Sequence, residues 1–406
     1  MEEFIERARE VLLKNKTNIG IIAGDYYREF WLRDFLISSL GMIISEDKEL
    51  IKVVKKGLET VARHQKFTGQ LPNKISLDEK KVCFGEGGCV DSSLWYPNII
   101  LSLFRVEKDF NFLKKHLKKV NMAVKWAICL DQNNDFLIEI NEGADWMDLL
   151  IRSGRVLYDN VLLYKALKDT TEINSILGGD EDFNFFAENL REAINLFLWP
   201  DKKNLNRIKE EYGFSRIDAD FEIAANSIPK ANYYLADLGF RKFDPRFDTL
   251  GNLLAVIFDV ADEEKKDKIL GFIEKEKLFE PYPVKALHPP ISLEDQCWNF
   301  YFRPTELPYL QKPGNYHNGG IWPFIGGFYI VALKKENKPW KDKFYKLLES
   351  CKLGNWRFSE WLSANGEPNG SANQSWSAAA LLYSCCLLYT SPSPRDRTRS
   401  RMPSSA

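Results

Sequence analysis

The sequence predicts an all-α fold in which helical hairpins form two concentric rings, an (α/α)6 barrel. Apolar residues recur at spacings of three and four in about a dozen segments, the periodicity of helices with a buried face. No long alternating pattern typical of strands interrupts them, and connections rich in Gly, Asn and Pro follow every second segment, as between hairpins. Half of the segments are mostly apolar and half carry Lys/Glu faces. We therefore expect an inner, buried ring of helices and an outer, solvated ring.

The expected helices follow one another along most of the chain. The first is amphipathic and covers residues 2–15, where Phe4, Ala8 and Leu12 share one face. The others cover residues 30–45, 49–64, 91–104, 110–130, 154–168, 182–198, 220–238, 250–260, 263–275, 321–334, 341–351 and 373–385. No linker divides them, so we expect a single barrel over residues 1–385. An α-solenoid is the alternative architecture, but the sequence lacks the fixed repeat period of such arrays.

The end of the chain differs in composition from the rest. From Cys386 to Ala406, an Ala/Leu-rich segment gives way to a Ser/Pro/Arg string without periodicity. This string resembles translated sequencing-adapter read-through at the end of a metagenomic reading frame. We expect residues 386–406 to be a non-native, disordered tail and the natural C-terminus to be missing. A genuine disordered tail would have a similar composition.

Charge and cysteine content exclude several classes of protein. The 56 Lys and Arg residues nearly balance 57 Asp and Glu residues, so neither a nucleic acid nor a membrane surface is expected as a partner. The longest apolar run, residues 35–44, is too short to span a membrane. The 7 cysteines are irregularly spaced and the first residues lack a signal-peptide pattern, so we expect a cytoplasmic protein. Cys83 and Cys89 have neither CxxC spacing nor a nearby His, and no metal site is expected.

Tryptophan is the informative residue of this sequence. Sugar rings present apolar C–H faces to aromatic side chains and hydroxyls to acids and amides. Five segments place Trp beside such polar groups where an expected loop meets a helix: FWLRDF (30–35), VDSSLWYP (90–97), NEGADWMD (141–148), YHNGGIWP (316–323) and NWRFSEW (355–361). Each segment alone is also compatible with a core Trp near one satisfied polar group. Because the inner-helix loops of a barrel gather at one end, we expect all five segments to line one mouth.

The order of the motifs resembles that of the six-hairpin glycosidases. The motifs are RDF (33–35), LPN (71–73), DSSLW (91–95), WMD (146–148), RSGRVLYDNVLLYKAL (152–167), GNLLAVIFDVADEEKKDKIL (251–270), YHNGGIWPF (316–324) and a segment from Glu360 that ends in QSWSAAA (374–380). The resemblance spans about residues 25–385 and is strongest to amylo-alpha-1,6-glucosidase, the glucosidase half of glycogen debranching enzymes, and to the alkaline/neutral invertases. The NGG.WP and Q.WS elements are fairly specific, whereas RDF alone is common. The resemblance implies a glycosidase that cleaves α-glycosidic bonds of a glucose-containing oligosaccharide or a glycogen-like glucan.

Two carboxyl groups would carry this chemistry. Hydrolysis with inversion needs a protonated carboxyl for the leaving oxygen and an ionised carboxylate, roughly 6.5 to 9.5 Å away, that activates water on the opposite face. Asp148 matches the general acid of the family, and the apolar neighbours Trp146 and Met147 could raise its pKa. Glu360 matches the general base. Asp145 is an alternative acid, and a helix N-cap is the alternative role of Asp148.

The remaining matches imply contacts with the sugar. Arg33 and Asp34 match a charged pair that holds hydroxyls in the reactive subsite, and a structural salt bridge is their alternative role. Arg152 and Arg155 are expected to shape the pocket floor or to bind a second sugar unit. Further hydrogen bonds and stacking surfaces are expected from Trp31, Asp91, Trp95, Asp145, Trp146, Arg155, His317, Asn318, Trp322, Trp361, Gln374 and Trp376.

Two other functions compete with hydrolysis. A sugar epimerase on the same barrel would use paired His residues, but the chain has 4 His and His317 lacks an evident partner. A non-catalytic carbohydrate-binding barrel would not need Asp148 and Glu360, and both are present. The sequence does not distinguish a glucan from sucrose as the substrate. The deciding contacts are expected from loops 69–88 and 207–220, whose conformations do not follow from the sequence. We expect a carbohydrate partner, no cofactor and no metal, and leave the oligomeric state open.

Overall fold

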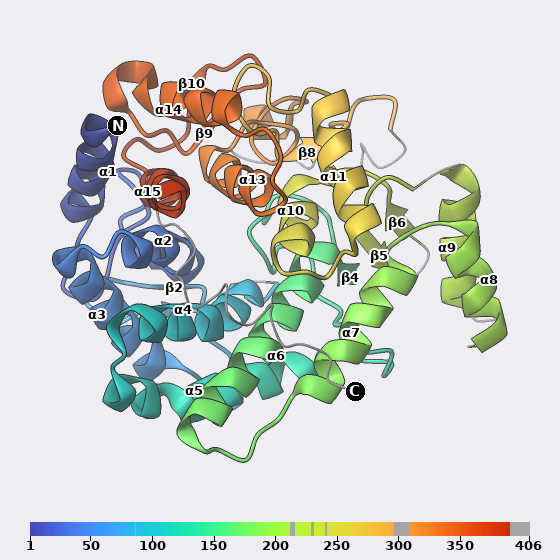
Figure 1. Cartoon of the computed structure of the whole chain (residues 1–406), viewed down its shortest axis with the longest axis horizontal. Helices are drawn as coiled ribbons and strands as arrows, with labels where there is room; N and C mark the ends of the chain where they lie inside the picture. Colours follow the sequence, from blue (N-terminus) through green and yellow to red (C-terminus); the bar gives the residue numbers. More distant parts are fainter. Residues whose placement is uncertain (86, 212–215, 229–230, 240–241, 296–307, 390–406) are drawn as a thin grey trace, which may run out of the picture.

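The described chain is mostly helical (Figure 1). A computed structural model describes residues 1–85, 87–211, 216–228, 231–239, 242–295 and 308–389. Its helices are α1 Glu2–Lys14, α2 Leu32–Ile44, α3 Lys48–His64, α4 Asp91–Glu107, α5 Phe110–Ile128, α6 Leu157–Leu177, α7 Asn184–Phe197, α8 Lys202–Glu211, α9 Arg216–Ser227, α10 Thr249–Ile257, α11 Glu263–Lys275, η1 Pro308–Gln311, α13 Pro323–Lys335, α14 Lys341–Trp356 and α15 Ser375–Tyr389.

Six of these helices form a closed inner ring. Helices α2, α4, α6, α10, α13 and α15 pack side by side in this order, and α15 returns to contact α2. Five inner helices pack against the outer helix that follows each of them in the chain: α3, α5, α7, α11 and α14. The sixth inner helix, α15, is covered by α1 from the other end of the chain. The predicted (α/α)6 barrel is therefore confirmed, and its last hairpin joins the two ends of the described chain.

Burial divides the two rings as their sequence patterns predict. Every residue of α2 except Ile44 is buried, whereas α3 buries one stripe and exposes its Lys and Glu side chains. Small residues let the inner helices approach one another closely. A Cβ added to Gly41 of α2 would lie 1.9 Å from the backbone oxygen of Ala379 in α15. This close approach explains a glycine inside a helix, where glycine otherwise costs about 1 kcal/mol.

Short antiparallel strands fix the loops at the mouth of the barrel. They are β1 Phe30–Trp31, β2 Lys74–Ile75, β3 Val82–Cys83, β4 Arg155–Val156, β5 Asp237–Gly239, β6 Lys242–Asp244, β7 Phe247–Asp248, β8 Leu287–His288, β9 Trp361–Leu362 and β10 Pro368–Asn369. Strands β1, β4 and β7 lead directly into the inner helices α2, α6 and α10. Because the inner helices all run in the same direction, their first residues meet at one end of the barrel, and the candidate site residues lie there.

The segment from α8 to β5 differs from the expectation. The sequence pattern predicts one helix over residues 220–238, but α9 ends at Ser227 and Asp237 begins β5. Pro229 accounts for the end, because the residue before a proline is disfavoured in helical conformation. Helix α8 has no counterpart in the prediction, since Leu205 and Ile208 alone mark its buried face. The expected specificity loop at 207–220 is thus helical at both of its described ends, and residues 212–215 lie outside the described chain.

The C-terminal boundary also differs. Helix α15 continues through Tyr389, beyond the end expected at residue 385. The rest of the predicted tail, residues 390–406, lies outside the described chain, so its nature and the single domain over 1–385 stay predictions. In the part that the structure describes, Cys83, Cys89, Cys129 and Cys351 are free thiols. Within the same part, no helix is long and apolar enough to cross a membrane, and no cluster of three or more His, Cys, Asp or Glu side chains could hold a metal ion.

Candidate active site

A cavity at the mouth of the barrel brings together residues from distant parts of the chain. It has a volume of about 60 Å³ and is lined by Ala23, Tyr27, Trp31, Arg33, Asp34, Trp146, Asp148, Tyr316, Glu360 and Trp376. Larger hollows occur elsewhere among the described residues, such as one of about 390 Å³ beside Glu188 and Lys265, but no aromatic side chain lines that hollow. Aromatic rings beside several carboxyl groups are what sugar recognition requires. Chemistry therefore identifies the smaller cavity as the candidate site.

The barrel explains how these residues meet. Trp31 lies in β1, and Arg33 and Asp34 occupy the first turn of α2. Trp376 lies in the first turn of α15, which packs directly against α2. Trp146 and Asp148, in the loop between α5 and β4, and Glu360, just before β9, also line the cavity. The first turns of two neighbouring inner helices and the loops at the same end of the barrel thus form the site together.

Glu360 is held by three hydrogen-bond donors. The hydroxyls of Tyr27 and Tyr316 donate to its Oε1 at 3.0 and 3.4 Å, and the Ser371 N–H donates to its Oε2 at 2.8 Å. The Glu360 side chain is only 3% exposed. Hydrogen bonds donated to a carboxyl group favour its ionised form, because an ionised carboxylate is the stronger acceptor. This environment suits a general base.

Opposing effects set the pKa of Glu360. Burial raises this pKa to about 7, and the nearby carboxyl groups of Asp34 and Asp148 add to the rise. The hydrogen bonds from Ser371 and Tyr27 lower it again. A base is most effective when its pKa lies near the working pH, so Glu360 is suited to act around neutrality.

The backbone around Glu360 is strained. Gly370 has a φ of +67°, and a Cβ added there would lie 2.5 Å from Glu360 Oε2. Tyr316, Phe358 and Asn373 are non-glycine residues with φ of 41°, 44° and 50°. Such left-handed conformations are costly for non-glycine residues and often cluster at functional sites, where the surroundings enforce them.

Asp148 lines the same cavity as Glu360. It lies in a turn of the loop 141–151, so it is not the N-cap of a helix. Its side chain is exposed although protein surrounds it closely, as expected for a group on the wall of a narrow cavity. Loss of hydration raises the pKa of Asp148, the Arg33 guanidinium opposes this rise, and the Asp145 carboxylate adds to it. A raised pKa suits a proton donor.

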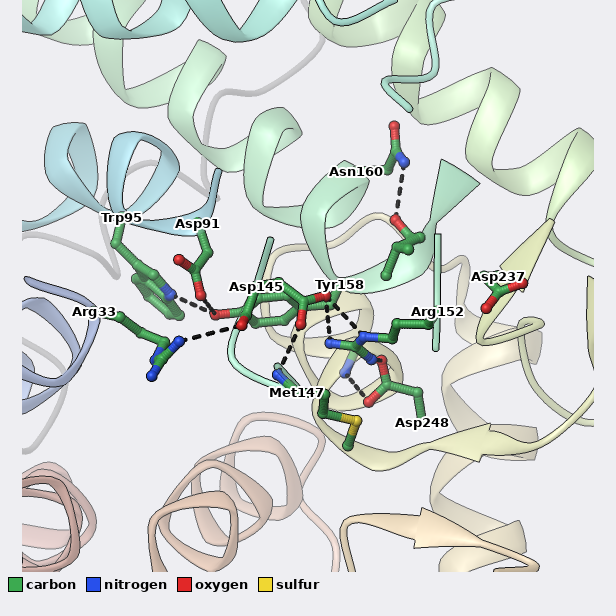
Figure 2. Close-up of polar contacts among 12 residues, drawn as sticks. Arg33, Asp91, Trp95, Asp145, Met147, Arg152, Tyr158, Asn160, Asp237 and Asp248 are labelled. Atoms are coloured by element: carbon green, nitrogen blue, oxygen red, sulfur yellow. Dashed lines mark hydrogen bonds and ion pairs between the residues drawn. The ribbon is translucent and has the colours of Figure 1, made fainter. Parts of the chain in front are cut away.

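Asp145, the alternative acid, is engaged elsewhere. Its Oδ2 accepts from Arg152 Nε at 2.8 Å and pairs with Nη2 at 2.7 Å, and its Oδ1 accepts from the Met147 N–H at 2.7 Å (Figure 2). Asp145 is buried and does not line the cavity. With both oxygens occupied, Asp145 has no free edge to present to a substrate. The geometry favours Asp148 over Asp145 as the proton donor.

Arg33 and Asp34 form an ion pair that also faces the cavity. Arg33 Nη2 lies 3.7 Å from Asp34 Oδ2, and Gln374 Nε2 donates to Asp34 Oδ1 at 3.2 Å. Burial raises the pKa of Asp34 to about 6, against the opposing charge of Arg33. Arg33 and Asp34 can therefore form a structural salt bridge and contact a sugar at the same time, because this salt bridge is part of the cavity wall.

Several predicted site residues lie behind the cavity rather than on its surface: Asp91, Trp95, Asp145, Arg155, His317, Asn318, Trp322, Trp361 and Gln374. Trp95 Nε1 donates to the Tyr158 hydroxyl at 2.9 Å, and this hydroxyl lies 3.4 Å from Asp91 Oδ2 (Figure 2). Arg155 Nη2 pairs with Asp135 at 2.7 Å, away from the cavity. Trp95, Asp91 and Arg155 therefore have their polar partners within the protein.

The residues around Trp322 form a packed aromatic layer behind the cavity. Trp322 is 0% exposed, its Nε1 donates to the Tyr316 carbonyl at 3.0 Å, and its ring stacks on His317 at 5.3 Å. Asn318 exchanges hydrogen bonds with the Ile291 backbone, at 2.6 and 3.0 Å. This layer supports Tyr316 and Trp146, which do line the cavity.

Sequence reasoning did not assign a role to Tyr27 or Tyr316. Tyr27 lies four residues before Trp31, in the loop that enters β1, and Tyr316 is the first residue of the YHNGG motif. The sequence signal that could have indicated a role for them is a Tyr close to a motif of aromatic and acidic residues. Their shared target, Glu360 Oε1, becomes visible only in three dimensions.

Comparison with known families gives one match over most of the chain. A family model described as alkaline and neutral invertase matches residues 21–391. In Oryza sativa subsp. japonica, neutral/alkaline invertase 1, mitochondrial, is 23% identical over 89% of this chain and 65% of the relative. From the same organism, neutral/alkaline invertase 3, chloroplastic, is 24% identical over 77% of this chain and 58% of the relative, and cytosolic invertase 1 is 23% identical over 77% and 62%. The chain spans less than two thirds of the length of these relatives. Their names specify three compartments, so a cytoplasmic location stays a prediction.

Solved structures share the fold at low sequence identity. A GH63 mannosylglycerate hydrolase from Thermus thermophilus, in complex with Tris and D-glycerate, has a TM-score of 0.70 at 14% identity, covering 94% of this chain and 99% of that chain. A GH78 family rhamnosidase of a Bacillus species has a TM-score of 0.60 at 15% identity, covering 94% of this chain and 34% of that chain. Likeness at these identities concerns the helical barrel alone.

Proposed function

The chain belongs to the alkaline and neutral invertase family, within the six-hairpin glycosidases, and we propose that it is an inverting glycoside hydrolase whose first candidate substrate is sucrose. The family match favours this activity over the amylo-alpha-1,6-glucosidase-like activity to which the motifs alone also pointed. Cleavage of a short α-glucoside is the common core of both.

One observation carries the proposal: Asp148 and Glu360 line the same cavity, together with the indole side chains of Trp31, Trp146 and Trp376. Two carboxyl groups in one aromatic-lined cavity are what acid and base catalysis of glycoside hydrolysis needs. The occupied oxygens of Asp145 support the choice of Asp148 as the acid.

The reaction follows from this arrangement. Asp148 donates its proton to the glycosidic oxygen as the bond from this oxygen to the anomeric carbon breaks. Glu360 takes a proton from a water molecule, whose oxygen forms a new bond to the anomeric carbon from the opposite face, so the configuration inverts. Tyr27 and Tyr316 orient the Glu360 carboxylate, while Arg33 and Asp34 hold sugar hydroxyls.

The assignment of the two roles rests on hydrogen bonding rather than on pKa alone. Burial raises the pKa of both carboxyl groups, so this direction does not separate acid from base. Glu360 accepts three hydrogen bonds, which favours its ionised form, whereas no other side chain in the described part of the chain donates one to Asp148.

The test is hydrolysis of a substrate panel by the purified protein. We expect glucose and fructose from sucrose, with β-glucose as the first anomer seen by NMR. Isomaltose, maltose, panose, a limit dextrin, trehalose and glucosylglycerate complete the panel. Cleavage of isomaltose or panose in preference to sucrose would move the substrate toward a glucan. Release of α-glucose first, or no release from any member, would overturn the proposal.

A further inference from the structure

Three buried charged side chains, Asp145, Arg152 and Asp248, contact one another (Figure 2). The Arg152 guanidinium contacts Asp145 through Nε and Nη2, at 2.8 and 2.7 Å, and Asp248 through Nη1, at 3.0 Å. All three residues are buried. The planar guanidinium, with donors in fixed directions, can hold two carboxylates at once in one geometry. We call Asp145, Arg152 and Asp248 the Arg152 clamp.

The clamp ties the loop to a rigid helix. Asp248 is the N-cap of the inner helix α10, and its other oxygen accepts the Gly251 N–H at 3.2 Å. The loop is closed at its base by two hydrogen bonds of 2.9 Å between the backbones of Ile140 and Gly154. Between these closed ends, the clamp fixes the middle of the loop to the barrel, as expected for a compact loop held by its own side chains.

Asp145 also holds the backbone next to Asp148. Its carboxylate accepts the Met147 N–H at 2.7 Å, one residue before Asp148, and its carbonyl oxygen accepts from Arg33 Nη1 at 3.2 Å. Asp148 receives no hydrogen bond from another side chain in the described chain. The direction of its carboxyl group therefore depends on the backbone of the loop.

We propose that the Arg152 clamp is the positioning device of the acid: it directs Asp148 toward the leaving oxygen without touching the substrate. This inference rests on the proposed function. Displacement of a catalytic group by about 1 Å can cost up to roughly a hundredfold in rate, so a loosened loop should impair proton donation. It should leave attack by water, which depends on Glu360, largely intact.

The variant Asp248→Asn tests the proposal. Asn keeps an oxygen for the Gly251 N–H but removes the anion that faces Arg152. We expect kcat on sucrose to fall by about tenfold, with little change in KM, since proton donation to a sugar leaving group is impaired. On α-glucosyl fluoride, whose fluoride leaves without a proton, we expect a loss of about twofold or less.

Two further variants make the test specific. Asp47→Asn is the matched control, because Asp47 also caps a helix, α3, and also pairs with an arginine, Arg9, at 2.7 Å, but lies outside the site. It should leave both activities unchanged. Arg152→Lys keeps the charge but cannot hold two carboxylates in the planar arrangement, so it should reproduce the selective loss on sucrose.

The outcomes separate the two proposals. Equal losses on sucrose and the fluoride, or no loss on either, would overturn the clamp proposal while leaving the hydrolase proposal intact. Unfolding of both clamp variants, judged by melting curves beside a folded Asp47→Asn, would show that the clamp is structural only. A wild-type protein that cleaves neither substrate would overturn the proposed function and the clamp proposal with it.

Discussion

The two walls of the cavity hold their carboxyl groups in opposite ways. Glu360 lies at the start of a β-hairpin, and three donors fix its oxygens directly. Asp148 lies in a loop, is exposed, and is fixed only through the contacts of Asp145 and Arg152. The difference matches the proposed chemistry. A base benefits from a pre-oriented, ionised carboxylate, whereas an acid must keep its proton free for the leaving oxygen.

The largest effect is expected when either carboxyl group is removed. Asp148→Asn and Glu360→Gln should each lower kcat on sucrose by about a thousandfold or more, because each removes one half of the acid and base pair. Both changes preserve shape, so melting temperatures should change little. On α-glucosyl fluoride, Asp148→Asn should recover most of its activity and Glu360→Gln should not. The reverse pattern would exchange the two roles.

The pH dependence of the rate should report the ionisation of Glu360. Glu360 must be ionised to act, and its pKa is raised to about 7. We expect kcat/KM to fall by about tenfold per pH unit well below this pH, as Glu360 gains a proton. It should also fall at higher pH, as Asp148 loses its proton. Initial rates on sucrose between about pH 5 and 9 check this. A rate that rises on acidification below about pH 6 would contradict the assignment of Glu360.

Removing one hydrogen-bond donor to Glu360 should lower the activity without abolishing it. Tyr27→Phe should lower kcat by about tenfold, since a hydrogen bond to a charged group contributes roughly 1.5 to 3 kcal/mol. The bond from Tyr27 lowers the pKa of Glu360, so its loss should move the acid limb of the profile to higher pH. Tyr316→Phe, which removes the longer of the two bonds, should do less. Equal activity of Tyr27→Phe and wild type on the acid limb would show that the bond is unimportant.

The smallest effect is expected from a glycine that contacts the base. Gly370 and Gly178 have nearly the same φ, +67° and +66°, so Ala at either position should cost about 1 to 2 kcal/mol of stability. A Cβ at Gly370 would displace Glu360, whereas one at Gly178 meets nothing within 4 Å. Gly370→Ala should therefore also lower kcat by a few fold. Equal kcat in the two variants would mean that Glu360 tolerates the displacement.

Much of the candidate site could be predicted because its motifs are local. Arg33, Asp34, Trp31 and Trp376 were expected at the start of helices and are found there, on the cavity wall. Periodicity marks where an inner helix begins, and the barrel brings these ends together. Trp322 and Trp361 were expected to stack on the sugar, but they are packed behind the cavity. A Trp on the cavity wall and a Trp packed behind it have the same sequence pattern, a Trp beside polar residues, so the sequence does not distinguish them.

The sequence by itself determined the helical barrel and the motifs at its mouth, because both depend on periodicity and on neighbours along the chain. Only the tertiary structure decided which carboxyl groups face the cavity. Asp145 and Asp148 are three residues apart and look alike in sequence, but Arg152 and the distant Asp248 engage the first and leave the second free. Likewise, Tyr27 precedes α2 and donates to Glu360, which precedes α15, and these two helices are distant in sequence but packed side by side in the ring. Such contacts between distant segments leave no periodic signal in the chain.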